Sequence, residues 1–212
     1  MTPETLLHLA ESDPVMGRLI QRIGGCTLNP EPQRTPFESL VRAVAHQQLH
    51  GKAAETILGR FLARFPGRRF PKPEDLESVT DADLRSFGFS GSKVAAIRDI
   101  AAKAIDGTVP TSRKIRTLSD DDIVERLSAC RGVGRWTVEM LLIFKLGRPD
   151  VLPIDDFGVR EGFRVTYGLD LQPRPKELLA YGERWRPFRT TAAWYLWRAA
   201  DAAKEAAKVS KP

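Results

Sequence analysis

The stretch that decides the fold is Leu127-Ser128-Ala129-Cys130-Arg131-Gly132-Val133-Gly134-Arg135-Trp136-Thr137, in which two glycines flank one apolar residue. A helix capped by Ser119-x-x-Asp122 is expected before it, and an apolar helical stretch from Val138 to Leu146 follows. The glycines allow a tight turn and leave the amides at the start of the second helix facing outward. Such a turn can bind phosphate, although it also occurs as a plain connection between helices.

The chain before this turn is predicted to be helical. Thr35-Pro36-Phe37-Glu38 predicts a helix start, because it combines a capping residue, a first-position proline and a glutamate three residues after the cap. That helix breaks in the polar stretch 45–51, and another begins near Lys52. After a connection over 66–75, Thr80-x-x-Asp83 starts a short helix, and an amphipathic helix is expected over 93–103.

After the turn, residues 151–156 predict an extended approach to a further helix, and helices are expected over 176–184 and 190–208. No segment combines strand alternation with hairpin turns. The sequence therefore predicts an all-α fold.

Composition narrows the class of protein. With 42% hydrophobic and 28% charged residues, the 212-residue chain is typical of a globular protein. The net charge of +6 favours an anionic partner, although charge alone is weak evidence for nucleic acid. The first ten residues lack a signal-peptide pattern, and no apolar run approaches the ~18 residues of a membrane span. We therefore expect a cytoplasmic, bacterial-type protein that does not enter a membrane.

The glycine turn, followed by Pro153-Ile154-Asp155-Asp156-Phe157-Gly158-Val159-Arg160, resembles the signature of the helix-hairpin-helix (HhH-GPD) DNA glycosylase superfamily. Three further segments, 46–54, 88–98 and 183–189, resemble its alkylpurine branch, the 3-methyladenine DNA glycosylase II type. The resemblance runs from about Phe37 to about Arg198. It implies a nucleoid-associated monomer that acts on double-stranded DNA containing alkylated bases.

The resemblance also implies an architecture of two helical lobes with the active-site cleft between them. The expected central lobe, with the wedge segment, covers 35–115. The hairpin and the catalytic aspartate occupy 116–160, and the second lobe combines 1–34 with 161–212.

Within the hairpin, the resemblance implies that the amides of Gly132, Gly134 and Trp136 grip a phosphate next to the lesion without reading sequence. Thr137 is assigned to the same DNA-binding set.

The resemblance further implies that the turn carbonyls around Ser128, Cys130 and Val133 can hold a monovalent or similar cation. No cofactor is expected. The iron–sulfur motif of some relatives is absent, because no cysteine follows Cys130. The two cysteines, Cys26 and Cys130, are expected to be buried free thiols.

A carboxylate is the expected catalytic group. Cleavage of an N-glycosidic bond builds positive charge on the sugar, which a nearby anion stabilises, and the same carboxylate can orient or deprotonate water. By resemblance, Asp156 is the catalytic residue, whereas a gap-free count against other branches would select Asp155. As an adjacent pair, one is expected to function and the other to cap a helix.

Bifunctional members carry a nucleophilic lysine in the second hairpin helix, and this chain has Trp136 at the matching position. The Schiff-base route therefore lacks its amine, so hydrolysis by water without strand cleavage is expected.

A base must leave the stack before it can be excised, and the vacated space must be filled. Gln48 matches the inserted residue of the relatives. Leu49 is the alternative, and His50 is a candidate minor-groove contact.

Four tryptophans lie in the second half of the chain. Trp185 and Trp194 are expected in the core. The resemblance places Trp136 and Trp197 in the base pocket, where ring faces attract the cationic base that alkylation creates. The sequence thus predicts a glycosylase that flips and excises alkylated purines. The alternatives are a non-catalytic DNA-binding module or a glycosylase for another damaged base.

Overall fold

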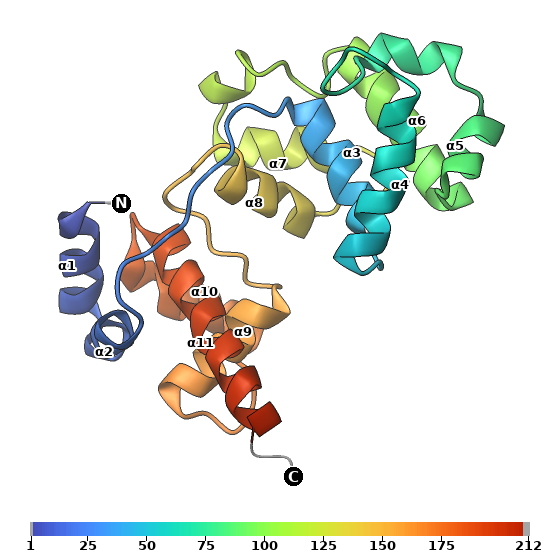
Figure 1. Cartoon of the computed structure of the whole chain (residues 1–212). Helices are drawn as coiled ribbons and strands as arrows, with labels where there is room; N and C mark the ends of the chain where they lie inside the picture. The colour runs from blue at the N-terminus through green and yellow to red at the C-terminus, as the bar shows by residue number, and fades with distance from the viewer. Residues whose placement is uncertain (1, 210–212) are drawn as a thin grey trace. The chain divides into compact units, whose positions relative to one another are not determined.

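The computed structural model describes residues 2–209, and these contain helices and no strands (Figure 1). The predicted all-α class is therefore confirmed. No helix in that range is long and apolar enough to cross a membrane. The chain divides into two compact units, one formed by Met1–Pro30 with Leu142–Pro212 and the other by Glu31–Leu141. The boundary falls inside α8 (Arg135–Phe144), so the segment 116–160 is shared between the units.

The first unit packs its helices around Trp185 and Leu196, both fully buried. Gly162 lets α9 (Phe157–Tyr167) approach α11 (Arg189–Val209) closely, since a Cβ there would lie 1.9 Å from the carbonyl oxygen of Leu196. Trp194 is also buried, so the prediction that Trp185 and Trp194 belong to the core is confirmed. The elements of this unit are α1 (Pro3–Ser12), α2 (Pro14–Ile23), α9 (Phe157–Tyr167), α10 (Pro175–Gly182), the 3₁₀ turn η3 (Glu183–Trp185) and α11 (Arg189–Val209).

Buried Asp13 connects the N-terminal helices to the rest of this unit. Its Oδ1 caps α2, while its Oδ2 accepts hydrogen bonds from the Tyr167 hydroxyl at 2.6 Å and the Trp185 indole at 3.0 Å. Burial alone would raise the pKa of Asp13, but these hydrogen bonds hold it below its ordinary value. The charge is therefore stabilised inside the core.

Two helices of the second unit begin where their capping motifs predict. Thr35 accepts the Glu38 amide at 3.0 Å, and Ser119 accepts the Asp122 amide at 3.1 Å. Phe61 is fully buried at the centre of a group of phenylalanine rings. The elements are α3 (Pro36–His46), α4 (Gly51–Ala63), η1 (Pro73–Ser78), α5 (Asp81–Phe87), α6 (Gly91–Ile105), η2 (Ile115–Thr117), α7 (Asp120–Ser128) and the start of α8.

Candidate active site

The hairpin turn joins α7 to α8 in the second unit. Gly132 has a φ of +75°, a left-handed conformation that favours glycine, and the Val133 amide donates to the Cys130 carbonyl at 3.1 Å. The Gly134 carbonyl accepts the first bond of α8, from Val138 at 3.2 Å. The helix therefore starts at this turn, and a helix N-terminus is an arrangement that can bind phosphate.

Side chains outside the hairpin hold the turn in place. The Arg131 amide donates to Asp99 of α6 at 2.7 Å, and Lys103 donates to the same carboxylate at 2.5 Å. Burial would raise the pKa of Asp99, but the hydrogen bonds from Lys103 and Arg131 lower it below the usual value. Gly132 sits tightly on this helix, since a Cβ there would lie 3.3 Å from the Cβ of Ala96.

The segment between α3 and α4 carries the predicted wedge. Gln48 is exposed and has a φ of +56°, so the backbone presents it in a conformation that side-chain-bearing residues rarely adopt. Leu49 and His50 follow it and are also exposed. All three candidates are therefore accessible from solvent.

Gln47, to which the sequence assigned no role, connects this segment to the hairpin. Its Nε2 donates to the Gly132 carbonyl at 2.8 Å. Lys93, at the start of α6, donates to the Ala45 carbonyl at 2.8 Å, and burial lowers the pKa of its ammonium group. The segment that carries Gln48 is thus positioned against the glycine turn of the hairpin.

Asp156 lies in the first unit, immediately before α9. Its Oδ1 accepts the Val159 amide at 2.8 Å and the indole N–H of Trp197 at 2.8 Å. Asp155 is exposed. Asp156 is the N-cap of α9, so its predicted catalytic assignment requires one carboxylate to serve both roles. Its cap bond and the Trp197 bond together fix the orientation of its carboxylate.

Glycine makes this contact between α9 and α11 possible. A Cβ on Gly158 would lie 2.9 Å from Cδ1 of Trp197 and 3.2 Å from Oδ1 of Asp156. Gly158 and Gly162 are one turn apart, so they present one bare face of α9 to α11. A side chain at Gly158 would therefore force Trp197 or Asp156 to shift.

One aromatic ring packs against Trp197. The Phe144 ring stacks on Trp197 with centroids 5.6 Å apart, and Phe144 is 43% exposed. Sequence reasoning did not select Phe144, because it reads as one more apolar residue of α8. Trp136 is 46% exposed and belongs to the other unit.

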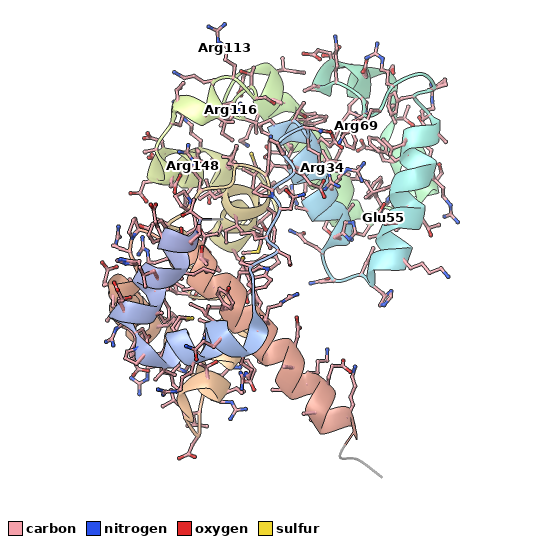
Figure 2. The ribbon with its side chains drawn as sticks, turned by 60° about the vertical axis from the view of Figure 1, so that its left-hand side comes forward. Arg34, Glu55, Arg69, Arg113, Arg116 and Arg148 are labelled. Atoms are coloured by element: carbon pink, nitrogen blue, oxygen red, sulfur yellow. The ribbon has the colours of Figure 1, made fainter. Side chains whose placement is uncertain are left out.

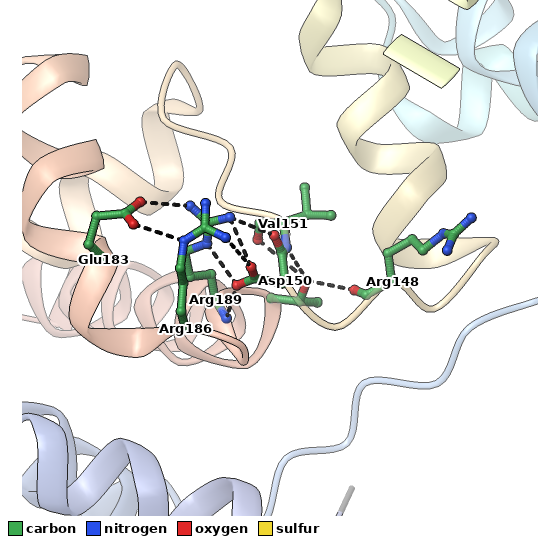
Figure 3. Close-up of polar contacts among 7 residues, drawn as sticks. Arg148, Asp150, Val151, Glu183, Arg186 and Arg189 are labelled. Atoms are coloured by element: carbon green, nitrogen blue, oxygen red, sulfur yellow. Dashed lines mark hydrogen bonds and ion pairs between the residues drawn. The ribbon is translucent and has the colours of Figure 1, made fainter. Parts of the chain in front are cut away.

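An ion network holds the chain that leads to Asp156 (Figure 3). Arg189 binds Asp150 through two nitrogens, at 2.7 and 3.0 Å, and also donates to Glu183 at 3.1 Å. The Thr190 hydroxyl accepts the Val151 amide at 2.9 Å. The resemblance had singled out residues 183–189, and the structure shows that Glu183 and Arg189 of that segment help to anchor residues 150–151 to the start of α11.

The remaining predicted site residues lie in the hairpin. Thr137 is buried, with 7% of its surface exposed. Cys130 is buried, and burial raises the pKa of its thiol to about 11, whereas Cys26 is half-buried. A carbonyl oxygen has two lone pairs, so that of Cys130 can accept the Val133 amide and also coordinate a cation. No group of three or more metal-binding side chains occurs in the described part of the chain.

This combination of a glycine hairpin with a carboxylate before the next helix defines a class of protein. Residues 41–187 match the HhH-GPD superfamily of base excision DNA repair proteins, and the chain belongs to that family. The resemblance found in the sequence is therefore confirmed.

Individual relatives are similar along most of their length. DNA-3-methyladenine glycosylase 1 of Schizosaccharomyces pombe is 42% identical over 91% of this chain and 85% of its own. Its structure in complex with abasic DNA has a TM-score of 0.80, covering 92% of this chain and 95% of that one at 40% identity. A DNA-3-methyladenine glycosidase structure from Bacillus halodurans has a TM-score of 0.86 at 33% identity, covering 96% and 92%.

Proposed function

We propose that this protein is a monofunctional DNA glycosylase that removes alkylated purines from duplex DNA and so starts base-excision repair. The observation that carries the proposal is the Asp156 carboxylate, held by the Trp197 indole at 2.8 Å beside the stacked Phe144 ring. The names of its relatives, which specify 3-methyladenine, support the choice of an alkylated base.

Different residues carry out different steps of the proposed reaction. The hairpin amides after Gly132 hold a backbone phosphate, and Gln48 fills the space that the extruded base leaves. The cationic base binds against aromatic faces, Trp197 among them. As the N-glycosidic bond breaks, its electron pair stays with the base, which leaves neutral. Asp156 stabilises the positive charge that develops on the sugar, and water adds to that carbon and loses a proton.

Two further expectations belong to this proposal. The protein acts without an amine nucleophile, because Trp136 occupies the hairpin position. Where a monovalent cation binds, the carbonyls of Ser128, Cys130 and Val133 would hold it and add positive charge next to the phosphate.

The test is a base-release assay on duplexes that each contain one lesion, with and without borohydride. Release of 3-methyladenine that leaves an intact abasic strand is the expected result. A borohydride-trapped protein–DNA adduct would contradict the monofunctional mechanism. Tight duplex binding with no base released from any alkylated substrate would instead indicate a non-catalytic DNA-binding module.

A further inference from the structure

Residues 88–98 form the turn before α6 and the first half of that helix, and none of them belongs to the proposed DNA-contacting set. The resemblance nevertheless singled this segment out, so its residues are expected to have another role. Lys93, Ala96 and Asp99 are spaced three residues apart and therefore lie along one side of α6. This side contacts the two parts of the second unit that are proposed to meet DNA, which are the hairpin and the segment between α3 and α4.

Lys93 holds the end of α3, shortly before the proposed plug. The Ala45 carbonyl lies in the last turn of α3, where carbonyl groups have no donor within the helix, and the Lys93 ammonium group donates to it at 2.8 Å. A lysine is unfavourable at this place, because the dipole of α6 repels a cation in its first turn and because burial lowers the pKa of the ammonium group. The contact with Ala45 is the interaction that offsets these two costs.

The backbone of Gln48 depends on such contacts. Its φ of +56° is strained for a residue with a side chain, and a strained conformation persists only where neighbouring contacts fix it. The Leu49 amide donates to the His46 carbonyl at 3.2 Å across Gln48, and Lys93 fixes the residue before His46. His46 also contacts Glu55 of α4 at 2.9 Å (Figure 2), but this pair is exposed, and exposed ion pairs contribute little. The partly buried Lys93 contact is therefore the stronger of these two anchors.

Asp99 holds the hairpin further along α6. Its Oδ2 accepts the Arg131 amide at 2.7 Å, and its Oδ1 accepts Lys103 at 2.5 Å. A carboxylate beside a phosphate-binding turn would repel the phosphate, and the positive charge of Lys103 offsets that repulsion. Ala96 supports the next residue of the turn, since its Cβ lies 3.3 Å from the position of a Cβ on Gly132. The backbone of the turn is thus held by α6 at two successive residues.

The same helix therefore holds both segments, and the bond from Gln47 to the Gly132 carbonyl at 2.8 Å joins them directly. We propose that α6 positions the two DNA-contacting segments relative to each other, with Lys93 placing the Gln48 plug and Asp99 placing the hairpin amides. Both are positioning residues, because each acts through another segment. Their roles rest on the proposed function, which assigns DNA contacts to these segments.

Lys93→Met tests the placement of the plug, because it removes the donor and keeps most of the side-chain volume. Single-turnover base release from a duplex lesion should fall about three- to tenfold, and less from a bulged lesion, where less flipping energy remains to be supplied. In a Gln48→Ala background, Lys93→Met should cause no further loss, because the plug is already absent. Lys114→Met, on an exposed lysine of the same unit, is the matched control and should change release less than about twofold.

Insertion of the plug can also be followed without catalysis. The probe is a duplex with an abasic-site analogue next to 2-aminopurine, whose fluorescence reports its stacking. Lys93→Met and Gln48→Ala should both reduce the fluorescence change at saturating protein, whereas Lys114→Met should not.

Asp99→Ala tests the placement of the hairpin. Affinity for damaged and undamaged duplexes should fall about tenfold, by similar factors, because the turn loses the acceptor for the Arg131 amide. Asp99→Asn keeps a carbonyl oxygen that can accept this amide, so its loss should be less than about threefold. Asp121→Ala, at an exposed aspartate of α7, makes the same charge change and should leave affinity within about twofold.

Several results would overturn the proposal. Unchanged release by Lys93→Met, equal losses on duplex and bulged lesions, or a further loss in the Gln48→Ala background would show that Lys93 does not act through the plug. Unchanged affinity in Asp99→Ala, or equal losses in Asp99→Ala and Asp99→Asn, would show that the bond to Arg131 does not place the hairpin. If the unmodified protein releases no base, the proposed function fails, whereas the fluorescence and affinity measurements still decide the roles of Lys93 and Asp99.

Discussion

The hairpin of the second unit and the carboxylate of the first unit are built in different ways. The hairpin presents backbone amides, and its geometry depends on Gly132 and on the bond from Gln47. The carboxylate of Asp156 depends on a side-chain partner, Trp197, and on the absence of a side chain at Gly158.

This difference separates binding from chemistry. Backbone amides recognise a phosphate that every nucleotide carries, so the hairpin unit should determine affinity for all duplexes alike. An oriented carboxylate acts on charge that appears only in the transition state, so the Asp156 contact should determine the rate of base release. Variants in the two regions should therefore affect different measurements.

The largest effect is expected for Asp156→Asn. Loss of the charge should slow single-turnover base release about 10³-fold, while affinity for lesion DNA changes little. Asparagine is also a good N-cap, so the melting temperature should stay close to that of the unmodified protein. Asp156→Ala should slow release similarly and also destabilise the fold by about 1 kcal/mol, because the cap is lost.

Asp155→Asn is the matched control, since Asp155 is exposed. Full loss of activity in this control together with an active Asp156→Asn variant would transfer the catalytic role to Asp155.

Gly158→Ala should have the next largest effect. The new methyl group would displace Trp197 or Asp156, and a misplacement of about 1 Å can slow a reaction by up to 10²-fold. We expect base release to slow about ten- to hundredfold with unchanged affinity for undamaged duplex. Gly59→Ala, in a helix where a Cβ meets nothing within 4 Å, is the control and should stabilise the protein slightly without slowing the reaction. Equal rates of base release by the two variants would show that the Trp197 contact does not position Asp156.

Gly132→Ala tests the expectation that the hairpin determines affinity for DNA. Alanine at a φ of +75° is strained by roughly 1–2 kcal/mol, and its Cβ would press on Ala96. Binding to damaged and undamaged duplexes should weaken about tenfold, by similar factors, while release at saturating protein stays near normal. Gly107→Ala carries similar strain at a φ of +85°, but no atom lies within 4 Å of its Cβ, and it should leave DNA binding unchanged. Slower base release at saturating protein, with unchanged affinity for DNA, would contradict the assignment of binding to the hairpin and of the reaction rate to the Asp156 contact.

The smallest effect is expected at Gln48. Gln48→Ala and Gln48→Gly both remove the plug, so release from duplex should fall by up to about tenfold, and less for a lesion in a bulge. Gln48→Gly should also stabilise the fold by about 1 kcal/mol, because glycine adopts this left-handed backbone conformation without strain. Equal losses on duplex and bulged substrates would point to a general contact with DNA.

The sequence by itself determined the helical class, the main helix starts and the location of the hairpin. These features depend on neighbouring residues, such as the cap from Thr35 to Glu38 and the two glycines around Val133. The core positions of Trp185 and Trp194 could also be predicted, because large aromatic side chains are usually buried.

Only the tertiary structure decided how the candidate site is held together. The bond from Trp197 to Asp156 joins residues 41 positions apart, and that from Gln47 to Gly132 joins residues 85 apart. Local patterns carry no information about such pairs, which form when helices pack. The N-cap role of Asp156 was likewise undecided beforehand, because adjacent aspartates have the same local propensity and the path of the backbone selects between them.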